Sequence, residues 1–263
     1  MPTVINGEII MNTHETLSLN KKLTLTGAFS ALVIVLGITK LGFITLGAAA
    51  SITILHIPVI LICMLAGLPE GLFVGATFGI LSLIQAAMSP TGALDPFFVN
   101  PLISVLPRML IAVIAWGLWK IFTNVSKLSK ENIIGITTLF LGLSITVLTN
   151  VLPTGVGVGV SILIASIIWL MLNNASKIPV VISAGVTAFL TTVAHTLLVL
   201  GFLYLFKGTD VRNALGGVGY FALVGMCGFN AILEAIAATI LCAAVFAGLF
   251  VAGKKHSKLS EEK

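Results

Sequence analysis

Long apolar runs separated by short polar segments make up most of this chain. They cover residues 23–46, 52–66, 70–88, 102–122, 133–152, 160–172, 178–206 and 219–252. Because about 20 helical residues cross the hydrocarbon core of a bilayer, these runs predict about eight membrane-spanning helices. Run 52–66 is short for a span, and we expect it to be irregular near Pro58. The pattern therefore predicts an all-α polytopic membrane protein.

Composition supports this class and excludes others. Hydrophobic residues make up 58% of the chain and charged residues 9%, whereas a soluble domain carries about 25% charged residues. The net charge of +5 comes from lysines that flank the apolar runs, so it indicates membrane orientation and not nucleic acid binding. Cys63, Cys227 and Cys242 lie inside apolar runs and are expected to be buried apolar side chains, without a disulfide or metal role.

Lysine positions predict the topology. With the amino terminus inside, most lysines fall on the cytoplasmic side, and both termini are cytoplasmic. Lys130 and Lys177 flank the segment 131–177, which must then cross the membrane an even number of times and is expected to be an inserted helical hairpin. We predict a cytoplasmic segment at 1–20, a single transmembrane domain at 21–252, and a basic cytoplasmic tail at 253–263. The segments 41–51 and 207–216 are expected to be outer loops, 41–51 with a broken helix as the alternative.

Small residues recur at the spacing that lets helices approach closely. Gly67, Gly71, Gly75 and Gly79 follow every fourth residue, and after Pro69 the last three share one helix face. Helix packing is the favoured interpretation, and ligand binding is the alternative. In the first run the small residues are Gly27, Ala28 and Ala31, which predict a second packing face, either within this protein or against another one.

Polar residues inside the apolar runs are the candidate site. They are His56, Asn100, Arg108, His195, Asn230 and Glu234. The predicted topology brings most of them to one level in the outer half of the membrane, where an ionisable group is costly to insert and is usually functional. Arg108 is expected to pair either with Glu234, as a structural ion pair, or with an anionic ligand. For the two histidines, hydrogen-bonded packing and ligand contact remain equally open, and two histidines alone do not predict a metal site.

Other side chains and motifs add little chemistry. We expect Phe97 and Phe98 to anchor the chain at the outer interface, with pocket lining as the alternative. No nucleotide-binding motif or catalytic constellation is visible, so we expect neither an enzyme nor a cofactor. Energy for any transport would come from an ion gradient or from other subunits.

Several segments resemble the substrate-binding membrane subunit, or S component, of energy-coupling factor (ECF) transporters, the vitamin importers of prokaryotes. They are TILHIPVI, the Phe78–Gly79 pair, PTGALDPFFVNPLISVLPR, AHTLLVLGFLYLF and GFNAILEAIAA, and the resemblance covers about residues 27–121 and 178–247. It implies a six-helix bundle in a prokaryotic plasma membrane, with a substrate pocket in the outer half. It also implies that Gly27, Ala28 and Ala31 dock onto a transmembrane scaffold protein carrying two ATPases. The segment 131–177 is extra to this pattern.

This resemblance makes a vitamin the expected ligand. Arg108 would suit a carboxylate, while His195 and Asn230 would suit hydroxyl or amide groups. Pantothenate is the first candidate, followed by folate or another small vitamin. The alternative is a self-sufficient secondary transporter or channel of eight spans, which should contain inverted repeats that this sequence does not show.

Overall fold

The computed structural model describes residues 2–5, 8–11, 17–45, 51–90, 94–124 and 180–261, with isolated residues between 131 and 169. Six α-helices make up most of these parts of the chain. They are α1 (Leu19–Ile38), α2 (His56–Leu65), α3 (Leu68–Met88), α4 (Pro101–Asn124), α7 (Val180–Ala214) and α8 (Tyr220–Glu261). The short 3-10 helix η1 (Asp95–Val99) precedes α4.

Five of the described helices are long and apolar enough to cross a membrane. They are α1, α3, α4, α7 and α8, whereas α2 has only 10 residues. This agrees with the predicted class of all-α membrane protein and with the short second run. The inserted hairpin predicted at 131–177 lies mostly outside the described residues, so the count of eight spans stays a prediction.

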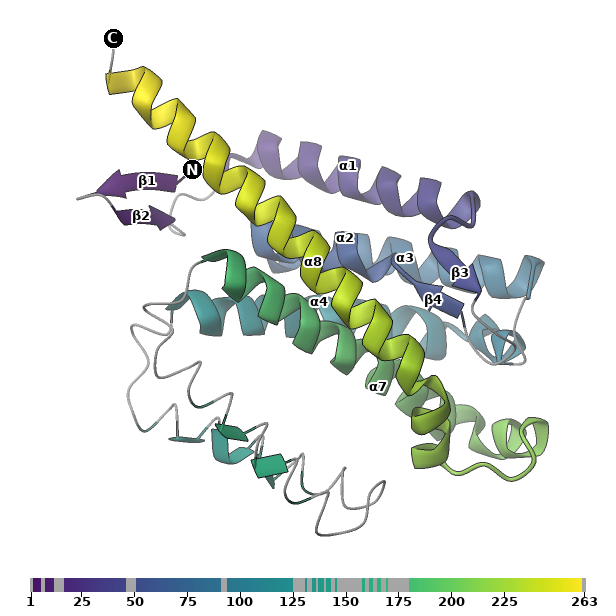
Figure 1. Ribbon diagram of the computed structural model, residues 1–263. Coiled ribbons are helices and arrows are strands. Elements are labelled where there is room, and N and C mark those ends of the chain that lie inside the picture. The colour runs from purple at the N-terminus through teal and green to yellow at the C-terminus, as the bar shows by residue number, and fades with distance from the viewer. Residues whose placement is uncertain are drawn as a thin grey trace.

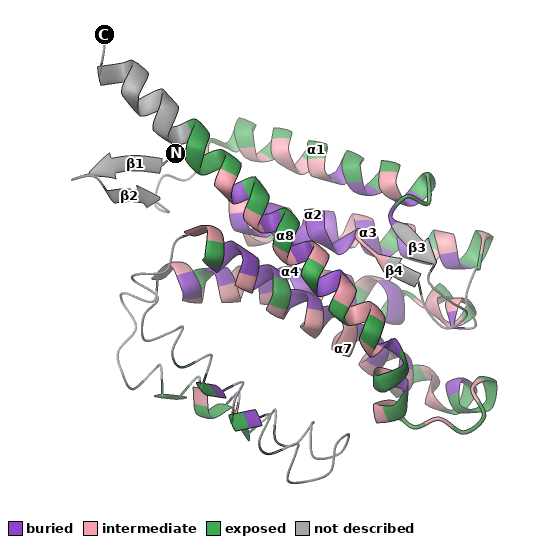
Figure 2. Ribbon diagram, viewed as in Figure 1, coloured by how far each residue is buried: buried purple, intermediate pink, exposed green. Residues whose placement is uncertain are grey.

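The helix α2 forms the centre of the bundle. Its residues from His56 to Met64 are all buried, and it contacts α1, α3, α4, α7 and α8. Figure 2 shows it as a continuous buried segment, whereas α1 and α8 expose their outward faces. Since those outward faces are apolar, with Leu32 on α1 and Ile240 on α8 among the exposed side chains, they suit contact with lipid.

Glycines on α3 lie directly against the backbone of α4. A Cβ on Gly75 would lie 2.7 Å from the carbonyl oxygen of Arg108, and one on Gly79 would lie 2.6 Å from the Cα of Val105. A Cβ on Gly71 would meet Cys63 on α2 and Ala112 on α4. As the contacts advance by four residues along α3, from Gly71 to Gly75 to Gly79, their partners on α4 decrease by three or four residues in number. This is the pattern expected for two antiparallel helices in close contact.

Gly67 does not belong to this contact. It precedes α3 with φ of 123°, and its backbone N–H donates to the carbonyl oxygen of Ile62. An L side chain rarely adopts this φ, so glycine is needed here for the turn between α2 and α3. The predicted helix-packing face therefore consists of Gly71, Gly75 and Gly79.

Two hairpins were not predicted from the sequence. β1 (Pro2–Ile5) pairs antiparallel with β2 (Glu8–Met11), and β3 (Phe43–Thr45) pairs antiparallel with β4 (Ser51–Thr53). Figure 1 shows them at opposite ends of α1, with the first close to the C-terminal half of α8. The first run therefore ends its helix at Ile38, earlier than expected, and the chain continues into a strand.

The polar segment 207–216 is also not the loop that was expected. The helix α7 continues through it to Ala214, with a kink at Lys207, where φ is −134° and ψ is 19°. The turn to α8 follows at Gly216 and Gly217, both with positive φ. The Lys207–Asp210 ion pair spans three residues in this segment, a spacing that stabilises a helix.

Candidate functional site

Buried polar side chains from several helices meet between α2, α4, α7 and α8. His56 begins α2, Arg108 lies in α4, His195 in α7 and Glu234 in α8, and all four are less than 7% exposed. The rings of His56 and His195 have centroids 5.4 Å apart. The structure thus brings together four of the six residues predicted for the site.

Proline chemistry explains how Arg108 is held. Pro107 lies inside α4 and has no backbone N–H, so the carbonyl of Ile103, four residues earlier, loses its helical donor. The Nη1 atom of Arg108 donates to that carbonyl at 2.8 Å, and Nη2 makes a longer contact of 3.5 Å with Ser82 Oγ. The proline therefore creates an acceptor inside the helix, and the neighbouring arginine fills it.

Aromatic rings surround the rest of the guanidinium. Arg108 Cζ lies 5.6 Å from the ring centroid of Phe78 and 5.2 Å from that of Phe98, distances at which a cation is attracted to a ring. The Phe78 centroid is also 6.0 Å from that of His195, so Phe78 contacts both the arginine and this histidine. Phe98, for which interfacial anchoring and pocket lining were the two expectations, thus contacts Arg108 in this cluster.

A direct ion pair between Arg108 and Glu234 was one of the two expectations, and it does not form. The ion pairs within the described residues join Lys22 to Glu70 and Lys207 to Asp210. The Nε atom of Arg108 is buried without a hydrogen bond. Glu234 Oε1 instead accepts a hydrogen bond of 2.6 Å from the backbone N–H of Thr53 on β4. The arginine thus keeps unused hydrogen-bonding capacity in a buried position.

The two histidines are also unsatisfied. Both ring nitrogens of His56 and both of His195 are buried without a hydrogen-bond partner. A buried polar group without a partner costs about 1–3 kcal/mol, so a cluster of them indicates a place for a ligand. The arrangement can bind a small molecule through one cationic end, an aromatic face and a second polar end.

The other two predicted residues contribute differently. Asn100 precedes α4, and its Oδ1 accepts a hydrogen bond of 3.0 Å from the backbone N–H of Leu102. This is the geometry of a helix N-cap. Asn230 is half-buried on α8, one helical turn before Glu234, which places it next to the cluster but not in its centre.

Comparison with known proteins assigns the family. The family model for the substrate-specific component of ECF transporters matches residues 21–156. This chain belongs to that family. It is also 29% identical, over 236 residues, to a protein named pantothenate transporter PanT from Leuconostoc mesenteroides subsp. mesenteroides, with 86% of this chain and 90% of that protein covered. The resemblance found from sequence motifs is thereby confirmed.

As an ECF substrate-specific component, the chain is a substrate-binding transport subunit and not an enzyme. Its predicted docking residues lie on an open face: Gly27, Ala28 and Ala31 are exposed on α1, and a Cβ on Gly27 would have no neighbour within 4 Å. Small residues on an uncovered helix face allow close approach of another helix.

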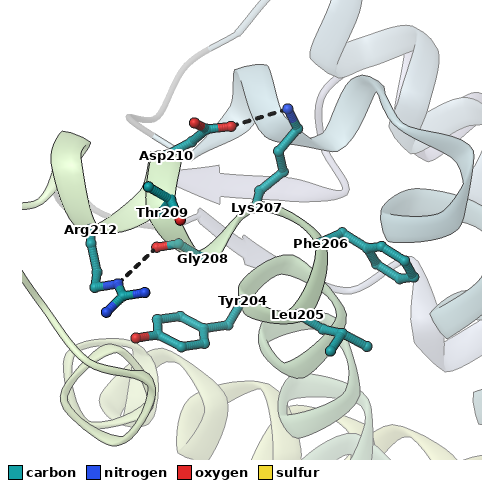
Figure 3. Close-up of a pocket in the computed structure, with 8 residues that line it drawn as sticks. All are labelled: Tyr204, Leu205, Phe206, Lys207, Gly208, Thr209, Asp210 and Arg212. Atoms are coloured by element: carbon teal, nitrogen blue, oxygen red, sulfur yellow. Dashed lines mark hydrogen bonds and ion pairs between the residues drawn. The ribbon is translucent and has the colours of Figure 1, made fainter.

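A separate surface pocket of about 240 Å³ lies at the end of α7 (Figure 3). Its lining runs from Tyr204 to Asp210 and includes Arg212, and none of these residues belongs to the polar cluster of this ECF component. The Lys207–Asp210 ion pair, at 3.1 Å, and the hydrogen bond of 3.3 Å from Arg212 Nε to the Gly208 carbonyl are local to the kink. These internal pairings account for its charged side chains, so we do not assign the substrate to it.

Sequence reasoning did not identify the residues that surround Arg108. Phe78 was noted only as part of the family resemblance and Ser82 was not singled out, while Phe98 was expected at the membrane interface, with pocket lining as the alternative. One available signal was Pro107, because a proline inside a helix frees the carbonyl four residues before it and a neighbouring arginine is a suitable donor.

Proposed function

We propose that this protein is the subunit that captures pantothenate, with folate or another small vitamin as the second choice, for uptake driven by ATP. In this proposal the cluster around Arg108 is the substrate site in the outer half of a prokaryotic plasma membrane. Both termini face the cytoplasm, where partner ATPases act through a transmembrane scaffold. The family and the name of the PanT relative support this choice.

The observation that carries the proposal is the buried arginine. Arg108 is 6% exposed, has no carboxylate in direct contact among the described residues, and keeps Nε without a partner. A buried charge is costly unless it is paired and hydrogen-bonded, so an anionic ligand would be stabilised strongly here. Pantothenate carries one carboxylate, at the end of its chain.

The opposite end of the cluster suits the rest of the molecule. His195, which contacts Phe78, lies together with His56 and the carboxylate of Glu234, and the ring nitrogens of both histidines are unpaired. Pantothenate has two hydroxyl groups and an amide there, with an apolar dimethyl group that can lie on an aromatic face. Asn230, one turn from Glu234, is the remaining candidate for a hydrogen bond.

Comparing pantothenate with pantothenol, in which an alcohol replaces the carboxylate, tests the arginine. We expect Arg108→Ala to weaken pantothenate binding by about 2 kcal/mol or more, roughly 30-fold, because a buried charge partner is lost. Pantothenol binding should change much less. Arg108→Lys keeps the positive charge but removes the planar guanidinium, so it tests whether two parallel hydrogen bonds are needed. Arg212→Ala removes an arginine outside the cluster and is the matched control. Equal losses for both ligands, measured by isothermal titration, would overturn the assignment of Arg108.

A second experiment tests coupling to partners. A bulky side chain on the open face of α1, as in Ala28→Leu or Ala31→Leu, should abolish pantothenate uptake by cells while leaving binding to the purified protein unchanged. Leu32→Ala, on an exposed residue of the same helix, serves as the comparison. Uptake by the purified chain alone in liposomes would contradict the proposal and favour a self-sufficient transporter.

A further inference from the structure

Three buried side chains from distant parts of the chain form a compact group. His56 at the start of α2, His195 in α7 and Glu234 in α8 each offer one ligand atom, and these atoms all lie within 4.8 Å of one another. All three side chains are nearly inaccessible to solvent. The function proposed above gives Arg108 a partner, the carboxylate of the substrate. The hydroxyl and amide groups at the other end of the substrate would not use all the hydrogen-bonding atoms of His56, His195 and Glu234.

The contacts of the group are unusual for packing residues. No ring nitrogen of either buried histidine has a partner at full hydrogen-bond geometry, although the His56 ring interacts electrostatically with the Thr53 backbone. Glu234, in contrast, is oriented, because the Thr53 N–H holds Oε1 and leaves Oε2 for another partner. Each neutral imidazole has one N–H and one nitrogen lone pair. The two histidines and the carboxylate can therefore offer one lone pair each to a shared cation.

We propose that His56, His195 and Glu234 bind one divalent transition-metal cation, whose open coordination positions are completed by oxygen atoms of the substrate. Two histidines and one carboxylate are a ligand set that holds Zn²⁺ with a free position. The Thr53 N–H then acts as the outer contact that orients a ligating carboxylate. Imidazole nitrogen selects zinc, nickel or cobalt over magnesium and calcium, which prefer all-oxygen sites.

Charge links the cation to the substrate. Arg108 and the cation would place two positive centres near one carboxylate, Glu234, in a buried site, and an anionic substrate reduces this imbalance. Binding of the cation and of the substrate should therefore favour each other, by the same factor in both directions. This part of the proposal rests on the function proposed above, whereas binding of the cation does not.

Cobalt is the probe for the site, because its visible absorption reports the ligands around it. The full-length protein in detergent is stripped with a chelator, titrated with Co²⁺ and then with Zn²⁺. We expect one equivalent of Co²⁺ to bind and Zn²⁺ to displace it. His56→Ala, His195→Gln and Glu234→Gln should each weaken binding by at least about 10-fold, since loss of even an outer contact has that effect.

The matched control is His256→Ala, which removes a histidine that the group does not contain. Circular dichroism checks that each variant keeps its helices, and the near-isosteric His195→Gln carries the conclusion if the alanine variant does not fold. No saturable Co²⁺ binding, or binding that persists in His195→Gln and Glu234→Gln, would overturn the proposal and leave only an adventitious ion.

Titration of pantothenate with and without Zn²⁺ separates the two proposals. We expect chelation to weaken pantothenate binding by about tenfold, which is 1.4 kcal/mol of coupling. Equal affinity in both conditions overturns the shared coordination while the proposed function stands. Cobalt binding at the group without any pantothenate binding leaves the cation site in place and overturns pantothenate as the substrate.

Discussion

Replacing Gly75 by alanine tests whether close contact between α3 and α4 positions the site. The added Cβ would lie 2.7 Å from the carbonyl oxygen of Arg108, whereas ordinary contact begins at 3.4 Å. The helices must therefore move apart by about 0.7 Å, and the obstacle is backbone, which cannot rotate away. Overpacking of this kind costs about 1–3 kcal/mol.

Gly225→Ala is the control that isolates this cost. Gly225 also lies inside a helix, α8, but a Cβ there would have no neighbour within 4 Å. Both variants gain the same helix propensity, about 1 kcal/mol, so the difference between them reports the contact alone. We expect Gly75→Ala to be less stable than Gly225→Ala by about 1–3 kcal/mol, with weaker pantothenate binding.

The measurement is unfolding in mixed micelles followed by circular dichroism, together with pantothenate titration of the same samples. Equal stability of the two variants would show that α3 and α4 are not in the contact described here. A loss of stability with unchanged pantothenate affinity would refute the link between this contact and the position of Arg108.

Four further predictions concern single residues. Pro107→Ala should raise thermal stability, because a proline inside a helix costs about 3 kcal/mol. It should also weaken pantothenate binding, because the new backbone N–H competes with Arg108 for the Ile103 carbonyl. Unchanged pantothenate affinity would argue against that competition. If Asn100 caps α4, Asn100→Ala should lower the free energy of unfolding by about 1 kcal/mol, and Asn100→Ser should restore most of this loss. Chemical unfolding of both variants measures the difference, and no loss in Asn100→Ala would contradict the cap. Gly67→Ala should destabilise the protein by about 1–3 kcal/mol because of its φ of 123°, whereas a melting temperature equal to that of the wild type would contradict the turn. Cys63, Cys227 and Cys242 are buried, so maleimide should label them slowly in the folded protein and rapidly after denaturation, as mass spectrometry would record.

The bounds of α3 and α4 could be predicted closely from the sequence. The ends of α3 and α4 differ by at most two residues from the predicted runs 70–88 and 102–122. Each begins at a proline-containing segment, and proline at the first turn both marks and permits a helix start. The two hairpins could not be predicted, because three or four residues of strand carry little signal and their pairing depends on the chain around them.

The candidate site was predictable in part for a different reason. Arg108, His195 and Glu234 stand out because an ionisable residue inside an apolar run is costly, and this argument needs no contacts. Which of them meet does require contacts: the sequence allowed Arg108 to pair with Glu234, whereas the structure pairs Glu234 with the Thr53 backbone and Arg108 with Ile103. The proximity of Glu234 to both histidines also depends on how α2, α7 and α8 pack, which hydropathy does not specify.

The repeated glycines and the buried arginine, which look like separate features in the sequence, are parts of one arrangement. The carbonyl oxygen that would meet a side chain at position 75 belongs to Arg108 on α4. The glycine face of α3 therefore determines how near Arg108 lies to Phe78, which is also on α3. On the other side, Pro107 frees the Ile103 carbonyl that binds the guanidinium. One backbone contact and one missing backbone donor therefore fix the two ends of a long, flexible side chain. In the proposed function, such a side chain would lose little further conformational entropy on binding a carboxylate, which favours tight capture of a small anion.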